Sequence, residues 1–241
     1  MSGLLDEVLV AHGGIDRWRA VTALTARGRF GGLLQSRFPG NRMAHVDVRV
    51  EMAEQRAVFR GFPQDGRQVV FDCGDVRLET GDAELISARH NPRAAFDGLS
   101  GLRRNFRWDA FDSAYFAGYA WWNYLSLPIL LTRDGVSVTE RGTTPGGQWR
   151  RLEVDFASAI HTHSQRQTFY VDDAGLIRRH DYVAYPIGRW ARAAHYCYDH
   201  REFGGLVFPT RRRVRPQGPR GRSLPGPVLV ALDIDEIEVE T

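Results

Sequence analysis

The hydrophobic periodicity of the chain changes near residue 22. Over residues 4–21, apolar side chains recur at helical spacing, with an interruption at Gly13-Gly14. From residue 22 to 80, and again from about 135 to the end, short runs alternate apolar and polar positions between turn-forming residues. The predicted strands cover residues 23–34, 43–52, 55–62, 66–73, 75–80, 136–142, 148–156, 163–172, 176–185, 191–202, 205–214 and 228–239. The pattern predicts an N-terminal helix followed by a long antiparallel meander.

Residues 91–131 interrupt the strands and are predicted to be a helical insertion. Asn91-Pro92 can start a short helix, and Asp109 is a suitable N-cap for a longer helix that runs to Leu127, where a proline stops it. Aromatic side chains lie on nearly all sides of the longer helix, which is typical of a helix surrounded by protein or by a ligand. Because a large sheet curls, this helix is expected to plug its concave face.

The expected fold is therefore mainly β (α+β): one half-barrel domain over residues 1–241, with a large curled antiparallel sheet, an N-terminal helix and an inserted aromatic helix. This order of elements resembles the half-barrel fold of the bacterial lipoprotein-carrier (LolA-like) proteins. The segments FYVDDAGLIRRHDYVA and AAHYCYDHREFGGLVFPTRRRV, residues 169–184 and 193–214, resemble an uncharacterised bacterial and fungal family with the same layout. The resemblance to the carriers implies a container for an apolar ligand.

Composition narrows the class of protein. Hydrophobic residues make up 43% and charged residues 25%, as in an ordinary globular protein. The net charge is +3, and acids are interleaved with arginines along most of the chain, so no nucleic-acid partner is expected. The N-terminus lacks the pattern of a signal peptide, and the longest uncharged run, 113–132, contains Asn123 and Pro128. We expect a cytoplasmic protein without a membrane partner, in which Cys73 and Cys197 are free thiols.

The common nucleotide-binding and hydrolase motifs are absent from the sequence. It contains no G-x-x-x-x-G-K-[ST], G-x-G-x-x-G, G-x-S-x-G or H-E-x-x-H. We therefore expect no organic cofactor. The oligomeric state is left open.

Strand alternation gathers titratable side chains in the C-terminal half. The loop Asp172–Gly175 pairs Val171 with Leu176, and a register continued across the next turn sets His180 beside His195. One face then carries His163, Gln165, Gln167, Arg178, His180, Tyr182, His195, Cys197, Asp199, Thr210 and Arg212. The other face carries Tyr196, Tyr198 and His200 with Ile177, Val183 and Val207. The pattern leaves open which face lines the cavity, because a slip of one residue exchanges them.

If the histidine face is concave, it lines a polar pocket under the aromatic helix. His180 and His195 are then the candidates for proton transfer, and Asp199 is the candidate that orients a histidine. The candidate substrate-binding residues are Arg178 and Arg212 for an anionic group, with Tyr182, Tyr115, Tyr119 and Trp122. This arrangement favours a cofactor-independent isomerase, cyclase or lyase that acts on a hydrophobic or aromatic small molecule.

Two alternatives to this enzyme remain open. A non-catalytic carrier of a lipid or other apolar ligand would use the half-barrel as a container. A metal-dependent enzyme could use His161 and His163, because their spacing puts two imidazoles on one face of a strand. The glutamate that usually completes such a site is missing, since Gln167 and Thr168 stand in its place.

Overall fold

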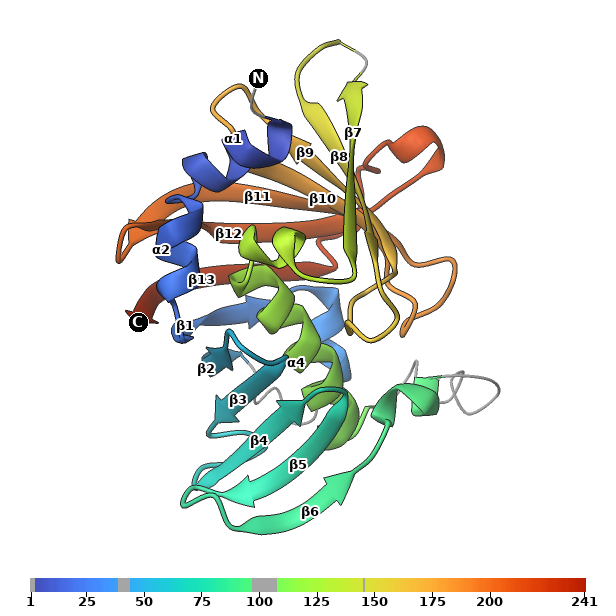
Figure 1. The fold of residues 1–241 in the computed structure, drawn as a ribbon. Helices are drawn as coiled ribbons and strands as arrows, with labels where there is room; N and C mark the ends of the chain where they lie inside the picture. Colours follow the sequence, from blue (N-terminus) through green and yellow to red (C-terminus); the bar gives the residue numbers. More distant parts are fainter. Residues whose placement is uncertain (1–2, 39–43, 97–107, 145) are drawn as a thin grey trace.

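A single curled antiparallel sheet organises the molecule (Figure 1). The computed structural model describes residues 3–38, 44–96, 108–144 and 146–241. Within these residues the sheet has 13 strands in the order β6-β5-β4-β3-β2-β1-β13-β12-β11-β10-β9-β8-β7. The strands are β1 (Ala23–Gly31), β2 (His45–Glu51), β3 (Arg56–Arg60), β4 (Arg67–Asp72), β5 (Asp75–Thr80), β6 (Leu85–Arg89), β7 (Val136–Thr143), β8 (Arg150–Phe156), β9 (Arg166–Val171), β10 (Ile177–Val183), β11 (Arg192–Phe203), β12 (Leu206–Pro216) and β13 (Val230–Glu240).

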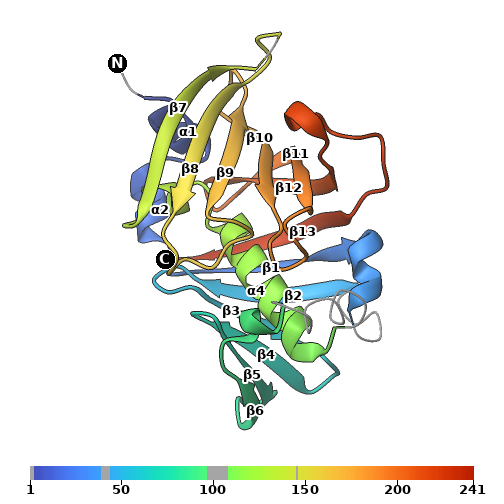
Figure 2. The ribbon, with the colours of Figure 1, turned by 90° about the vertical axis from the view of Figure 1, so that its right-hand side faces the viewer.

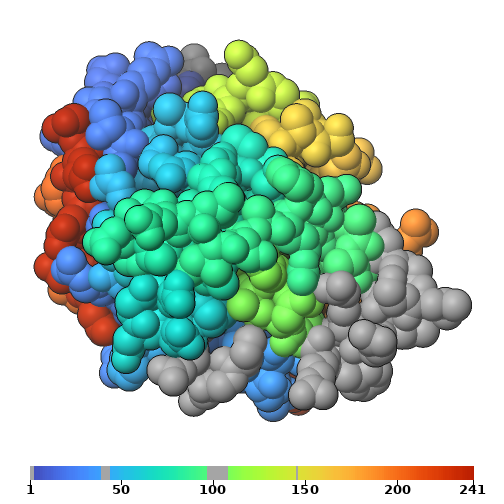
Figure 3. Space-filling view, turned by 90° about the horizontal axis from the view of Figure 1, so that it is seen from below, coloured from blue at the N-terminus to red at the C-terminus, as the bar shows by residue number. Residues whose placement is uncertain are grey.

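The first and last strands meet in the middle of the sheet. β1 pairs with β2 on one side and with β13 on the other. The N-terminal and C-terminal strands are therefore neighbours inside the sheet. The sheet bends around the helix α4 (Ala110–Leu125), and the strands β4 to β6 spread over the face seen from below (Figures 2 and 3). The expected mainly β half-barrel with a central helix is confirmed.

The sequence of α4 explains its position. The side chain of Asp109 caps the helix by accepting from the backbone N–H of Asp112, at 2.9 Å. Every residue from Asp112 to Leu125 is buried, as expected for a helix that is aromatic on all sides. Gly118 permits close contact with the sheet, since a Cβ there would lie 2.3 Å from the Cβ of Phe71.

The N-terminal helix is divided as its glycines predicted. Gly13 and Gly14 have φ of +112° and +87°, and they separate α1 (Leu4–Ala11) from α2 (Ile15–Ala20). The Trp18 ring packs against Phe208 of β12, with 5.4 Å between ring centroids. The two helices therefore close one end of the half-barrel.

Short 3₁₀ helices flank the main elements in the described residues. They are η1 (Leu33–Arg37), η3 (Pro92–Phe96), η4 (Ile129–Thr132) and η5 (Pro219–Gly221), the last in the proline- and glycine-rich loop. The predicted strand 23–34 was wrong at its end, because the chain leaves the sheet after Gly31 and continues into η1. The exposed strand β6 was missed. Residues 97–107 of the predicted insertion lie outside the described residues, and no described helix is both long and apolar enough to cross a membrane.

Candidate functional site

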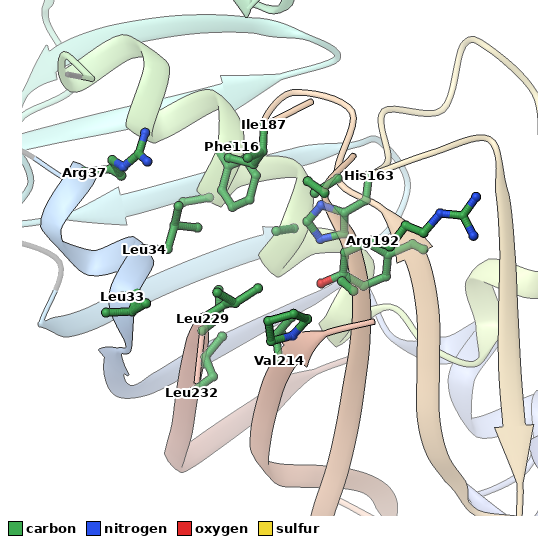
Figure 4. Close-up of a pocket in the computed structure, with 18 of the residues that line it drawn as sticks. Leu33, Leu34, Arg37, Phe116, His163, Ile187, Arg192, Val214, Leu229 and Leu232 are labelled. Carbon is green, nitrogen blue, oxygen red and sulfur yellow. The ribbon is translucent and has the colours of Figure 1, made fainter. Parts of the chain in front are cut away.

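A cavity of about 440 Å³ lies between α4, η1 and the C-terminal half of the sheet (Figure 4). Its lining is mostly apolar. Its walls comprise Phe30, Leu33, Leu34, Arg37, Phe38, Phe116, Ala117, Ala120, Trp121, Tyr124, His163, Tyr182, Ala184, Ile187, Trp190, Ala191, Arg192, Ala193, Val214, Pro216, Gln217, Leu224, Leu229, Val230 and Leu232. Pockets of several hundred Å³ with apolar walls and few polar groups are typical small-molecule sites.

Small side chains create this space. On α4, Ala117 and Ala120 face the cavity between the larger rings of Phe116, Trp121 and Tyr124. These positions follow the spacing i, i+1, i+4, i+5 and i+8, so they share one side of the helix. Opposite them, the sheet also contributes alanines at the ends of β10 and β11. The curled sheet and the alanines together leave a volume that the protein does not fill.

One polar wall of the cavity, apart from Arg37, Arg192 and Gln217, consists of neutral, mutually bonded side chains. The Nε2 atom of His163 lies 2.7 Å from the hydroxyl of Tyr124, and its Nδ1 atom lies 3.0 Å from the hydroxyl of Tyr119. The Tyr124 hydroxyl also lies 3.4 Å from that of Tyr182, which in turn lies 3.4 Å from Nδ1 of His195. These contacts form a chain of five side chains, of which His163, Tyr124 and Tyr182 reach the cavity.

Burial keeps this chain uncharged. Desolvation lowers the pKa of His163 to about 3, with a smaller contribution from Arg93, and it raises the pKa of Tyr124 to about 12. Desolvation also lowers the pKa values of His180 and His195 well below the usual range. At neutral pH these groups therefore act as neutral donors and acceptors.

The predicted pairing of His180 with His195 is confirmed, and both side chains are buried inside the half-barrel. Neither lines the cavity. His180 stacks on Phe169, with 4.2 Å between ring centroids, and its Nε2 atom bonds the side-chain oxygen of Gln167. The His195 ring meets the Tyr124 ring edge-on at 4.8 Å. The two histidines form a layer behind the tyrosines.

The predicted placement of Asp199 was wrong. Asp199 has a left-handed backbone conformation, with φ of +52°, although the β11–β12 register is the same on both sides of it, at the pairs Tyr198–Arg211 and His200–Pro209. Its exposed carboxylate lies 3.7 Å from Arg211. Because the left-handed backbone departs from the regular strand conformation, the Asp199 side chain is exposed and does not join the histidine face.

The predicted placement of Arg178 was also wrong. A register shift lies between Ile177 and Arg179, opposite β9. The bulge puts Ile177 in the hydrophobic core, and Arg178 pairs with Asp172 at 2.5 Å instead of lining the cavity. In this register His180 pairs with Phe169 of β9.

Arg212 is buried on the expected face but takes a different position. It pairs across the sheet with Cys197, whereas His195 pairs with Val214. Its guanidinium lies 4.8 Å from the Tyr124 ring centroid and donates to the Tyr124 carbonyl oxygen at 3.0 Å. Arg212 therefore supports Tyr124 from behind and does not reach the cavity.

The helix residues expected to bind substrate divide into two groups. Tyr119 contacts the site through His163, and Tyr115 lies 3.1 Å from Nδ1 of His161. Trp122 points to the N-terminal half of the sheet, where its indole N–H donates to two backbone carbonyl oxygens. The neighbouring Trp121 faces the cavity instead. A helix surrounded by protein gives no sequence signal for which side faces a cavity.

The two histidines of the metal hypothesis point to different surroundings. Tyrosine hydroxyls contact both ring nitrogens of His163, and His161 packs edge-on against Phe71. Within the described residues, neither histidine belongs to a group of three metal-binding side chains. The one such group there is Glu54, Asp72 and Cys73, which sequence reasoning did not single out.

Sequence reasoning missed the front wall of the cavity. Leu33 and Leu34 come from η1, Leu229 lies directly before β13, and Leu232 lies near its start. Leu33 is 56% exposed, and Trp190 at the mouth is 75% exposed. The double glycine before Leu33 was the available signal, because it ends β1 and turns an apolar pair toward the cavity.

Comparison with solved structures supports the fold. The chain is similar to a LolA superfamily protein from Nitrosomonas europaea, with a TM-score of 0.52 and 10% identity over 100% of this chain and 95% of that one. A DUF1329 family protein from Desulfovibrio piger aligns with a TM-score of 0.46 and 14% identity, over 98% of this chain and 92% of that one. No family model and no curated protein matches the sequence. The chain therefore has a LolA-like fold.

Proposed function

We propose that the protein binds an apolar small molecule inside the half-barrel, as a carrier does. The observation that carries this proposal is the cavity of about 440 Å³. It has roughly three times the volume of an engineered apolar cavity of about 150 Å³ that binds benzene. Burying apolar ligand surface against such walls contributes about 25 cal/mol per Å².

The polar wall fits one uncharged polar group on that molecule. His163, Tyr124 and Tyr182 already satisfy one another, so a ligand need not supply hydrogen bonds to them. A ligand carbonyl or hydroxyl could still contact the tyrosine hydroxyls, which can donate and accept. The wall therefore tolerates an apolar ligand and can orient one that carries a single polar atom.

A fluorescent apolar probe tests the proposal. N-phenyl-1-naphthylamine is neutral and brightens in apolar surroundings, so wild type should bind it with saturable, one-to-one stoichiometry. The variant Ala120→Phe fills the cavity from α4 and should lose at least about tenfold in affinity. The same change at the exposed Ala174 is the matched control and should leave affinity unchanged. Equal binding by all three proteins would refute a ligand site in this cavity.

A second candidate function is an enzyme that transfers protons to or from the bound molecule. The chain from Tyr119 through His163 to Tyr124 favours it, because hydrogen-bonded groups reach the cavity wall. His180 and His195, in the layer behind the tyrosines, would then influence the proton affinity of His163. To distinguish enzyme from carrier, molecules extracted from the purified protein are returned to wild type and to His163→Gln. Conversion by wild type alone supports the enzyme, whereas unchanged recovery from both supports the carrier.

A further inference from the structure

A second hollow adjoins the cavity and has a less apolar lining. It is lined by Arg93, Phe96, Val183, Tyr185, Pro186, Gly188, Arg189 and Arg192. Three of these eight residues are arginines and none is acidic. The hollow lies on the other side of the segment 183–192, which also contributes Ile187 and Trp190 to the cavity.

These arginines are not neutralised by carboxylates of the described part of the chain. Arg93 donates to the Tyr115 hydroxyl and to the Thr162 carbonyl oxygen, at 3.3 and 3.4 Å. Among the described ion pairs, none includes Arg93, Arg189 or Arg192. In the sequence, no aspartate or glutamate occurs between Asp181 and Asp199.

Three like charges around one hollow repel one another, and an anion placed among them removes that repulsion. Guanidinium groups suit the purpose because each offers parallel N–H donors that match a carboxylate or a phosphate. Tyr185, which is 47% exposed, lines the same hollow and carries a hydroxyl that can donate a hydrogen bond. The hollow therefore has the chemistry of an anion site.

Arg192 connects this hollow with the apolar cavity, because it lines both. In Figure 4 its guanidinium extends away from the apolar residues Leu33 and Leu34 on the other side of the cavity. Its aliphatic stem can cover apolar ligand surface while its charged end stays outside. One molecule with an apolar part and an acidic end can therefore contact both hollows across Arg192.

We propose that the ligand is an anionic amphiphile, whose apolar part occupies the cavity and whose carboxylate or phosphate binds Arg93, Arg189 and Arg192. This inference rests on the proposed function, since it assigns the charge of the molecule that the cavity holds. It also assigns a role to the arginines of the 183–192 segment that the sequence reasoning did not consider.

Matched ligands separate the two proposals. Dodecanoic acid, dodecyl phosphate and dodecanol share one apolar chain and differ in charge. Calorimetry at pH 7.5 and low salt should show that both anions bind wild type about tenfold or more tighter than the alcohol. The double variant Arg189→Gln/Arg192→Gln should bind all three with the affinity of the alcohol. The control Arg19→Gln/Arg201→Gln changes the net charge equally at exposed sites away from both hollows and should keep the preference.

Each outcome bears on a different claim. If the acid, the phosphate and the alcohol bind wild type equally, the anion site is refuted while the apolar cavity stands. If none of the three binds, the proposed function itself fails. Inorganic phosphate is the remaining arm: if it binds as tightly as dodecyl phosphate, the amphiphile is refuted, because the apolar chain then contributes nothing. If inorganic phosphate binds much more weakly than dodecyl phosphate, the result supports an amphiphilic ligand.

Discussion

Replacing an alanine of α4 by leucine should stabilise the protein where the alanine lines the cavity. The same replacement should destabilise the protein where the alanine lies in the filled core. Ala120 is 5% exposed and lines the cavity, whereas Ala114 is fully buried in the same helix and does not. Leucine adds three carbon atoms at either position. In a filled core such an addition forces neighbours apart and costs about 1–3 kcal/mol. In an apolar cavity it buries new surface without displacing any atom.

The magnitude for Ala120→Leu follows from the area that the new atoms bury. Three buried carbon groups contribute about 2.4 kcal/mol at about 0.8 kcal/mol each, and ordering the leucine costs about 0.5–1 kcal/mol. The net gain is about 1.5 kcal/mol in the free energy of unfolding. For a chain of this length it should raise Tm by roughly 3–6 °C.

Thermal unfolding followed by circular dichroism, on protein stripped of bound molecules, measures both variants against wild type. Ala120→Leu should raise Tm, and Ala114→Leu should lower it by several degrees. If both variants lower Tm by similar amounts, the space beside α4 is filled in solution and the reasoning is refuted. Since the two sites share helix, residue type and burial, helix propensity cannot account for a difference in sign.

Three further predictions follow from the site. The pKa of His163 is lowered to about 3 in the folded protein, so on acidification the unfolded chain takes up this proton at a higher pH than the folded protein does. The free energy of unfolding should therefore fall as the pH drops below about 6.5, by about 2 kcal/mol at pH 5 for this residue. Urea titrations at pH 7 and 5 should show this loss, and His163→Gln should show a smaller one; an equal loss would contradict the assignment. Trp190 is 75% exposed at the cavity mouth, so ligand should shift tryptophan emission to the blue, and Trp190→Phe should abolish the shift. Asp199→Asn should leave stability within about 0.5 kcal/mol and probe affinity unchanged, whereas a large loss would restore Asp199 to the site.

The sequence predicted the architecture well because that architecture rests on repeated local patterns. Alternation identified most strands, and the all-round aromatic helix placed α4 on the concave side. The His180–His195 pairing was correct because the turn between β10 and β11 sets the register over a short distance. Patterns of this kind are visible in the local sequence and do not depend on contacts between distant parts of the chain.

The same alternation failed where a strand departs from regular geometry. An extra residue near Arg178 and a left-handed backbone at Asp199 turned two expected site residues away from the histidine face. The residue types alone predicted neither irregularity. Asp199 occupies a left-handed conformation that aspartate tolerates better than most residues, but aspartate is also common in regular turns. Each irregularity depends on the fit between neighbouring strands, which the sequence of a single strand does not determine.

The cavity was beyond the reach of pattern reasoning for a different reason. Its walls come from five separate parts of the chain, and its volume results from alanines where larger side chains would also suit a buried position. Hydrophobic periodicity marks Ala117 and Ala120 as core positions but does not show whether a neighbour fills the space beside them. Only the curvature of the sheet decides that, and curvature is a property of all strands together.

Tyr124 joins the two parts of the site that sequence and structure revealed separately. Its ring faces the apolar cavity, and its hydroxyl belongs to the polar chain that ends at His195. Behind it, the Arg212 guanidinium contacts the ring and its Nη2 atom donates to the backbone carbonyl. The histidine layer predicted as catalytic is thus placed to position the cavity wall. A change at His195 or Arg212 should therefore alter ligand affinity through Tyr124, without either residue touching the ligand.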